Sequence, residues 1–514
     1  MTVSYQSTVD TGGDGFARLL RAEWTKFHTV RGWTIGLVVA MLLTALFGLV
    51  PSDSCSNGDK PCVAAPVGPG GEAVVDRFYF VHQSLTGNGS ITVRLASFTG
   101  GYTTHPGPAA DGGPQALIPG LEPWSKAGVL IKAGLAQGSA YAALLATGDH
   151  GIRMQYDYTH DAAGPQVSAT SPHWLRLDRA GDTITGYDST DGQQWHPVGT
   201  AVLAGLPATV QVGMFATSPG HTVVSQSIGS SAVRGGPSQA TGVMDNVDLR
   251  GSGTGNAWTG TAITNGQDGP QGFNGGFQRD GGTFTVRGSG DIAPDTQGGA
   301  SITQPLVGTF FGLIAVAVVG AMFISAEYRR GLIRTTLVAH PRRGEVLAAK
   351  AIVLGAVTFV TGLAAAGFAM VFGVQHLRAE VPVNPIAVGT EIRIVVGTAA
   401  LLAVAAMLAL ALGAVLRRGA GAVAAVFVVV VLPYLLGEVP TILPSEVQTW
   451  LLRITPAAAF AVQQAYPRYP QVDAQYSVIA GYYPLPPLAG LAVLCGYAAL
   501  ALILAAVLLR RRDV

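Results

Sequence analysis

The chain has 514 residues, and its 31 basic and 30 acidic residues leave a formal net charge of +1. Charged residues make up 12% of the sequence, about half of the roughly 25% found in soluble domains, and the mean hydropathy is +0.38. This combination excludes a disordered chain, which needs low hydropathy and high charge, and it argues against a basic nucleic-acid-binding protein.

Residues 1–32 are expected to form an amphipathic helix. Leu20, Trp24 and Phe27 recur at helical spacing, with basic side chains elsewhere, which is typical of a helix lying on the inner leaflet of a membrane. The plain alternative is a simple anchor beside the first apolar run. A signal peptide is disfavoured because 32 residues are too many for its basic leading region.

Six charge-free apolar runs are expected to cross the membrane. Each has about 17–23 residues, which at about 1.5 Å per residue crosses a hydrocarbon core of roughly 30 Å. A buried core helix is the alternative for a single run, but six runs flanked by arginines favour membrane spans. The runs are 33–50, 305–325, 351–373, 394–416, 420–436 and 487–509, so spans 2–6 occupy residues 305–514.

Basic residues are unevenly divided between the two sides of these spans. Fifteen Lys and Arg side chains flank the spans on the side of both termini, whereas the short loops opposite hold Arg378, Arg453 and Arg468. The positive-inside rule therefore predicts cytoplasmic termini. An even number of spans independently requires the termini to share a side, which places residues 51–304 outside the cell.

Residues 51–304 read as an all-β sandwich. They are rich in Gly, Ser, Thr, Asp and Pro, and short alternating segments such as 90–95, 152–156 and 174–178 are separated by turn clusters. The expected fold class is therefore mixed: a six-helix transmembrane α bundle plus an extracellular β-sandwich (jelly roll) inserted between spans 1 and 2.

Cys55 and Cys62 lie just after the first span, in a Pro- and Gly-rich stretch. Outside the membrane two neighbouring cysteines favour a disulfide. A metal site would need more ligands, and no His lies beside them, so no metal site is predicted.

The loop 327–350 between spans 2 and 3 has room for a short helix, a break at Pro341 and a second helix. Its six cations exceed what orientation requires, which favours a docking surface for acidic groups of a partner. The alternative is that they set topology and bind anionic lipid. The residues expected to act there are Glu327, Tyr328, Arg329, Arg330, Arg334, Arg342 and Arg343.

Catalytic chemistry is not indicated. No segment matches the ATP-binding pattern G-x-x-x-x-G-K-[ST], so no cofactor is expected on this chain. The spans carry no Asp, Glu, Lys or Arg, which counts against a secondary transporter. Trp124, Trp174 and Trp195 offer stacking surfaces for sugar rings, although Trp in a sandwich is more often a core residue. A glycoside hydrolase would need an acid pair that is not visible.

The segments 19–26, 324–337 and 341–344, together with the Thr455-Pro-Ala457 motif, resemble ABC type-2 transporter permeases of the actinobacterial type. The resemblance implies a permease subunit in a bacterial plasma membrane, an exporter driven by a separate cytoplasmic ATPase subunit that binds the ATP. It further implies a homodimer or heterodimer of permeases, a coupling helix within 327–350, and contact of the N-terminal helix with the ATPase. The long domain after the first span departs from the family's usual short loop.

Residues 74–250 resemble concanavalin-A-like (laminin-G-like) jelly-roll modules, through segments such as 124–131, 174–177 and 187–192. The resemblance implies this fold and an extracellular glycan as a candidate ligand. It supports the alternative function, a membrane-anchored glycan-binding or sensing protein that transports nothing. Residues 282–292 resemble the opening strand of such modules, so Phe284–Val286 is expected to pair back near residues 76–95. The alternative is a floppy Gly-rich linker.

Overall fold

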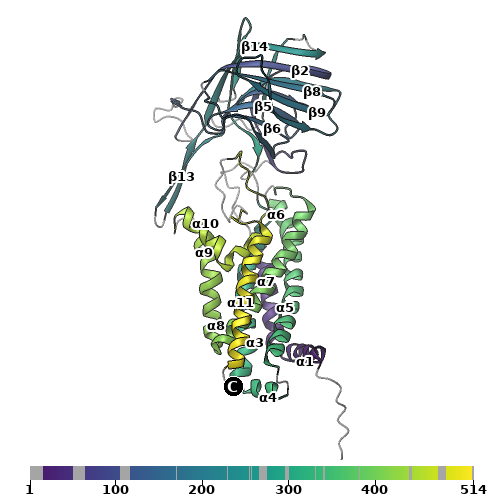
Figure 1. Cartoon of the computed structure of the whole chain (residues 1–514), viewed down its shortest axis with the longest axis vertical. Helices are drawn as coiled ribbons and strands as arrows, with labels where there is room; N and C mark the ends of the chain where they lie inside the picture. Colours follow the sequence, from purple (N-terminus) through teal and green to yellow (C-terminus); the bar gives the residue numbers. More distant parts are fainter. Residues whose placement is uncertain are drawn as a thin grey trace, which may run out of the picture.

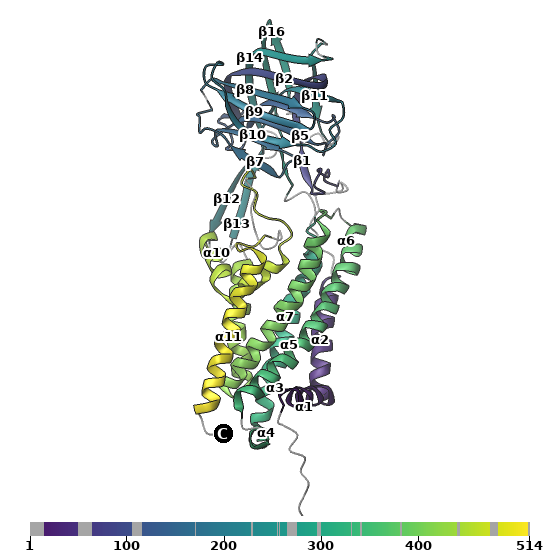
Figure 2. The ribbon, with the colours of Figure 1, turned by 45° about the vertical axis from the view of Figure 1, so that its right-hand side comes forward.

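The computed structural model has a β domain stacked on a bundle of helices along its long axis (Figures 1 and 2). It describes residues 15–49, 64–104, 116–169, 171–227, 230–253, 255, 257–264, 275–295, 300–329, 331–339, 342–380, 383–438, 443–472 and 482–511. The predicted Cys55–Cys62 disulfide lies outside these ranges, as does Arg330.

The helices are of two kinds: the long ones are apolar on nearly all sides, as expected of segments surrounded by lipid and by each other, whereas those at 16–29 and 445–454 are amphipathic. They are α1 (Phe16–Thr29), α2 (Arg31–Phe47), α3 (Gly308–Arg329), α4 (Leu332–Ala339), α5 (Arg343–Phe368), α6 (Val374–Glu380), α7 (Val388–Leu416), α8 (Gly419–Val426), α9 (Leu432–Glu438), α10 (Ser445–Ile454) and α11 (Pro487–Arg511), with short 3-10 or π turns at Gln304–Val307, Ala369–Gly373, Phe427–Val431 and Pro456–Gln463.

Five of these helical segments are long and apolar enough to cross a membrane: 304–329, 343–379, 388–416, 419–437 and 487–511. A sixth is added if α1 and α2, which meet at a bend of 75°, count as one broken span. The structure therefore contains five or six helical segments able to span a membrane, against the six that were predicted. The segment 419–437 stays helical past Pro433, although proline has no backbone N–H to donate. A π turn at Phe427–Val431 directly precedes this residue and accommodates the missing hydrogen bond.

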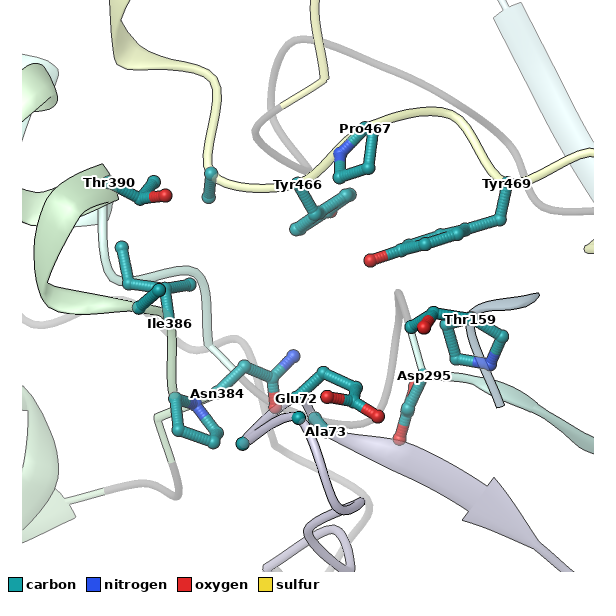
Figure 3. Close-up of a pocket in the computed structure, with 16 residues that line it drawn as sticks. Glu72, Ala73, Thr159, Asp295, Asn384, Ile386, Thr390, Tyr466, Pro467 and Tyr469 are labelled. Atoms are coloured by element: carbon teal, nitrogen blue, oxygen red, sulfur yellow. The ribbon is translucent and has the colours of Figure 1, made fainter. Parts of the chain in front are cut away.

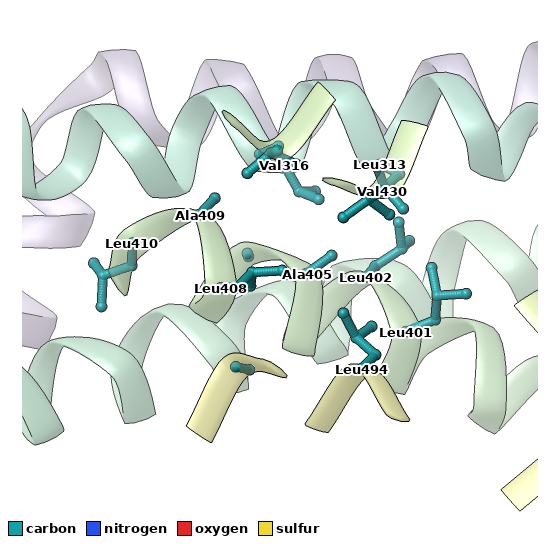
Figure 4. Packing of buried hydrophobic residues seen from close by; sticks show 14 of the residues in the cluster. Leu313, Val316, Leu401, Leu402, Ala405, Leu408, Ala409, Leu410, Val430 and Leu494 are labelled. Atoms are coloured by element: carbon teal, nitrogen blue, oxygen red, sulfur yellow. The ribbon is translucent and has the colours of Figure 1, made fainter. Parts of the chain in front are cut away.

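Helices α3 and α7 form the centre of the bundle core. Leu313 and Val316 of α3 face Leu402 and Ala405 of α7, as Figure 4 shows. Close approach depends on small residues, since a Cβ added to Gly320 would lie 2.4 Å from the carbonyl oxygen of Ala406. Such small-residue contacts let neighbouring helix backbones pack at van der Waals distance in a membrane.

The β domain follows α2 and precedes α3 in the chain. Its strands are β1 (Val74–Asp76), β2 (Phe78–Tyr102), β3 (Ile118–Pro119), β4 (Lys126–Lys132), β5 (Tyr141–Thr147), β6 (Ile152–Tyr156), β7 (His160–Ala163), β8 (His173–Ala180), β9 (Thr183–Ser189), β10 (His196–Val202), β11 (Thr209–Thr217), β12 (His221–Ser227), β13 (Ser230–Gly236), β14 (Ser238–Ser252), β15 (Thr259–Ile263), β16 (Gly276–Asp280), β17 (Thr283–Gly288) and β18 (Ile292–Pro294). Strand pairing is antiparallel throughout.

The 25-residue strand β2 organises the sandwich. Its first half, residues 78–86, pairs with β11 and β15, and its second half, residues 89–102, pairs with β8 and β14. Strand β8 shows the predicted alternation: Leu175 and Leu177 are buried, and the residues between them are half-exposed. The prediction of a β-sandwich is thus confirmed.

The segment around Phe284 is a strand, so the linker alternative is wrong, but its expected partner is wrong as well. Strand β17 pairs with β14, where Phe284 lies opposite Met244, rather than with residues 76–95. The reason is that β2 already has a neighbour on each edge. The two ends of the domain meet one strand later, where Ile292 of β18 lies opposite Asp76 of β1.

Substitution Phe284→Ala tests this closing strand. Phe284 is buried beside Trp258, so its removal should destabilise the β domain by about 3–5 kcal/mol. In hydrogen exchange on the full chain, amides of β17 should lose protection, whereas Val202→Ala at an exposed site should change little. Unchanged protection in Phe284→Ala would mean that β17 contributes no packing energy.

Candidate functional site

Helix α1 lies across the distal end of the bundle, defined here as the end opposite the β domain (Figures 1 and 2). Its buried residues are Leu19, Glu23 and Phe27, spaced four apart on one face. Leu19 packs with residues of α5, and the ring of Phe27 meets that of Phe323 of α3 at 5.5 Å. Of the predicted apolar face, Phe27 is buried, Leu20 is half-buried, and Trp24 is 51% exposed.

A buried ionic cluster joins α1, α3 and α5 at this end; we call it the distal hub (Glu23, Lys26, Glu327 and Lys350). The fully buried ammonium of Lys350 donates to Glu23 Oε2 and to Glu327 Oε1, both at 2.6 Å. Lys26 Nζ donates to Glu23 Oε1 at 2.9 Å and to Glu327 Oε1 at 3.4 Å. Two cations and two carboxylates therefore balance within one cluster.

The charge balance makes the hub stable only as a complete set. A buried ion pair offsets its desolvation through mutual attraction and good hydrogen-bond geometry, and removing one partner leaves an uncompensated charge. Lys350 Nζ also lies 4.8 Å from the centre of the Phe323 ring, a cation–π contact that adds attraction. The hub therefore fixes the relative positions of three helices.

The predicted coupling loop contains the expected short helix, α4, and second helix, α5, while the expected break at Pro341 lies outside the described residues. Gly331, with φ of +68°, turns the chain from α3 into α4 at the distal tip, and α5 begins at Arg343. The left-handed conformation suits glycine because it has no Cβ. Arg334 lies on α4.

The other predicted coupling residues divide between internal contacts and the surface. Arg343 Nη1 donates to the carbonyl of Leu509 at 2.5 Å and so joins α5 to α11. The Tyr328 ring lies 5.4 Å from the guanidinium of Arg417. Arg329 is exposed, and Arg342 is exposed with a contact to Glu345 at 3.1 Å. Glu327 belongs to the hub, where Lys350 and Lys26 donate to its Oε1.

At the opposite end, a cavity of about 230 Å³ lies between the β domain and the helical loops, as Figure 3 shows. Glu72 and Asp295 come from the β domain, and Asn384, Tyr466 and Tyr469 from the loops. Burial raises the pKa of the Glu72 carboxyl, whose Oε1 is buried with no hydrogen-bond partner in the part of the chain that the structure describes. The cavity wall is thus shared by both parts of the molecule.

A direct hydrogen bond also links the two parts. The buried side chain of Gln471 donates to the carbonyl of Tyr158 at 3.1 Å. Tyr158 is held in place from inside the β domain, because its hydroxyl donates to Asp76 Oδ2 at 2.7 Å and accepts from Lys132 Nζ at 3.1 Å. Burial lowers the pKa of Lys132 and raises that of Tyr158. A rigid polar core therefore supports the contact with the helices.

The three candidate stacking tryptophans do not form one site. Trp124 is 2% exposed and stacks on His150 at 3.9 Å between ring centres, as a core residue does. Trp174 and Trp195 are half-exposed, and the guanidinium of Arg176 lies 5.9 Å from the Trp195 ring. Among the residues that the structure covers, no group of three or more His, Cys, Asp or Glu side chains could hold a metal ion.

The sequence pattern did not predict a role for Glu23 or Lys26. It indicated Lys350 only as one of the six cations of the loop 327–350. One signal was available: Glu23 is the one acidic residue among the apolar and basic residues of 16–29. A lone carboxylate between two apolar residues four positions away on either side indicates a buried partner.

A bundle of apolar helices with an ionic hub at one end and a β domain at the other is the arrangement of a multi-pass membrane protein. A family model described as ABC-2 family transporter protein matches residues 138–514. The chain therefore belongs to the ABC-2 transporter family, whose members are the membrane permeases of ABC transporters and leave ATP hydrolysis to a separate subunit.

Other comparisons add no functional argument. A search of curated proteins finds no match. Among solved structures, a functionally unknown protein from Saccharomyces cerevisiae is similar at 13% identity and TM-score 0.20, over 34% of this chain and 75% of that one. The GH43 protein BlXynB from Bacillus licheniformis gives 16% identity and TM-score 0.18, over 29% and 26%. Scytalido-glutamic peptidase gives 7% identity and TM-score 0.21, over 41% and 98%.

Substitution Lys350→Met should release α1 from the bundle. It leaves two buried carboxylates with only Lys26 between them, a cost of about 3–5 kcal/mol. A cysteine placed at buried Leu19 should then react at least about tenfold faster with a water-soluble maleimide.

Two further variants separate charge balance from packing. Glu23→Gln combined with Lys350→Met removes one charge of each sign and should restore part of the protection. Arg342→Gln, at an exposed residue of the same end, should leave the labelling rate unchanged. Equal labelling in all four proteins would show that the hub does not hold α1.

Proposed function

We propose that the protein is the membrane-spanning subunit of a bacterial plasma-membrane ABC exporter, driven by a separate cytoplasmic ATPase. The observation that carries the proposal is the distal hub, because it joins the amphipathic helix α1 to the two helices on either side of the tip helix α4. Family membership supports the ATPase partner, since this family's permeases work with ABC ATPase subunits.

In this proposal the distal end faces the cytoplasm and both termini lie there. The distribution of basic residues supports this orientation. Helix α2 then serves as the first span, with α1 on the inner leaflet, and the β domain is an extracellular insertion between spans 1 and 2.

The proposed coupling works through rigid contact. An ATPase that pushes on α4 would move α1, α3 and α5 together, because their charges cannot separate without exposing a buried ion. The spans would then alternate between inward-open and outward-open arrangements, with no proton or ion coupling required. A second permease subunit, identical or related, would complete the translocation path.

A glycan-binding or sensing role for the β domain is the second candidate. The half-exposed Trp174 and Trp195, with Arg176 between aromatic rings, offer stacking surface and a hydrogen-bond donor on one sheet face. A protein with this role alone would need no ATPase, so co-purification of an ATPase subunit from native membranes separates the two candidates.

Reporter fusions test the orientation. Fusions at Val514 and after Gly344 should report the cytoplasm, and a fusion near Thr200 should report the exterior. An external report at Val514 would contradict the six-span proposal, because an even number of spans places both termini on the same side, which is the cytoplasm in this proposal.

Charge reversal at the distal tip tests docking. The triple variant Arg329→Glu, Arg330→Glu and Arg334→Glu should weaken ATPase co-purification about tenfold or more, because like charges then face acidic groups of the partner. Arg453→Glu, an exposed arginine at the β-domain end, is the control. Unchanged binding of the triple variant at low and high salt would leave these arginines with a purely topological role.

A further inference from the structure

A lateral groove of about 690 Å³ opens at the distal end between the α1–α2 bend and helices α3 and α4. One wall is apolar and includes Trp33, Val319 and Met322, and the other end is polar and includes Lys26, Glu327 and Arg329. Helices α2 and α3 close the groove above, since a Cβ on Gly36 would lie 2.5 Å from Val319 Cγ2. The groove is therefore apolar toward the bundle centre and charged toward the distal tip.

The polar end has unused hydrogen-bonding capacity of both kinds. The Lys26 ammonium carries three protons and uses two on the hub carboxylates, and its side chain is 42% exposed. Arg329 is exposed and has no ion-pair partner within the described ranges. Glu327 Oε2 is buried, and no described residue donates to it. Two donors and one acceptor thus remain for a ligand.

The hub itself is balanced, but Arg329 beside it adds one positive charge to the polar end of the groove. Lys26, Lys350 and Arg329 carry three positive charges, whereas Glu23 and Glu327 carry two negative charges, which leaves one positive charge. A ligand that fits has one negative charge, a hydrogen-bond donor close to that charge, and apolar chains long enough to cover the wall beside Trp33 and Met322.

We propose that this groove binds one phospholipid with a singly anionic, hydroxyl-bearing headgroup, the chemistry of phosphatidylglycerol. The phosphate lies between Lys26 and Arg329, and a headgroup hydroxyl donates to Glu327 Oε2. The acyl chains lie along Trp33, Val319 and Met322. In the orientation proposed above, the lipid comes from the inner leaflet.

The groove discriminates against the other sources of a phosphate. A soluble phosphate ester leaves the apolar wall uncovered, and a zwitterionic headgroup brings no net charge to neutralise the surplus cation. A bound lipid touches α1, α2, α3 and α4 together, so it bridges the bend between the helix on the membrane surface and the first apolar helix.

The experiment is a lipid titration of the full-length chain, delipidated in detergent and followed by native mass spectrometry. Phosphatidylglycerol should bind at one molecule per chain, about tenfold more tightly than phosphatidylcholine or phosphatidylethanolamine. Arg329→Gln should lose about tenfold in affinity, as expected for one charge-assisted hydrogen bond, while Arg342→Gln should bind as the wild type does.

A steric variant keeps the test independent of charge and of ATPase docking. Gly32 lines the groove, and a Cβ added there meets no atom within 4 Å, so Gly32→Leu should occupy the groove without disturbing the fold. It should lower phosphatidylglycerol affinity about tenfold or more. Gly389→Leu is the matched control, because Gly389 lies in a helix at the other end with equally open space.

Three results would overturn the proposal. Equal affinity for all three lipids would remove the headgroup specificity, and full competition by glycerol phosphate would assign the site to a soluble anion. Wild-type binding in Gly32→Leu would place the lipid elsewhere, for example on a surface covered by a second copy of the chain. ATPase co-purification from the same preparations keeps failure of this proposal separate from failure of the transporter proposal.

Discussion

The ammonium of Lys350, buried among three helices, is the constraint on which the distal half of the molecule depends. A buried cation is tolerated only while its carboxylates remain within hydrogen-bond distance, so Glu23 and Glu327 fix the positions of α1 and α3 against α5. Apolar packing alone would permit these helices to slide, because one leucine contact resembles the next. The ionic cluster selects one arrangement and makes the end of the bundle move as a unit.

Hydrophobic pattern predicted most of the architecture, because burial leaves a periodic trace along the chain. The alternation at residues 174–178 correctly predicted that Leu175 and Leu177 face the sandwich core, and charge-free runs predicted the long helices. Long-range pairing left no such trace. Nothing near Lys350 indicates that its partner is Glu23, 327 residues away, since a lysine at the end of an apolar run looks like an orientation signal. The partner of β17 was missed for a related reason: local alternation specifies a strand but not the strand beside it.

The two ends of the bundle are connected by the same helices. Helix α5 carries Lys350 near its start, and the helical segment that it begins continues to residue 379, beside the loops that meet the β domain. At that end the Gln471 side chain donates to the carbonyl of Tyr158. The hydrogen bonds of Asp76 with Lys132 and with the Tyr158 hydroxyl fix the position of Tyr158. Polar contacts with fixed geometry thus stand at both ends of a largely apolar bundle.

The bend between α1 and α2 is held from both sides. Val30 adopts an extended backbone between the two helices, and no side chain caps the start of α2. On one side of the bend the hub restrains α1, and on the other side small-residue contacts restrain α2 against α3, as where a Cβ on Gly312 would lie 2.0 Å from Thr44 Oγ1. Because α3 takes part in both sets of contacts, the protein's own packing holds the 75° bend between α1 and α2.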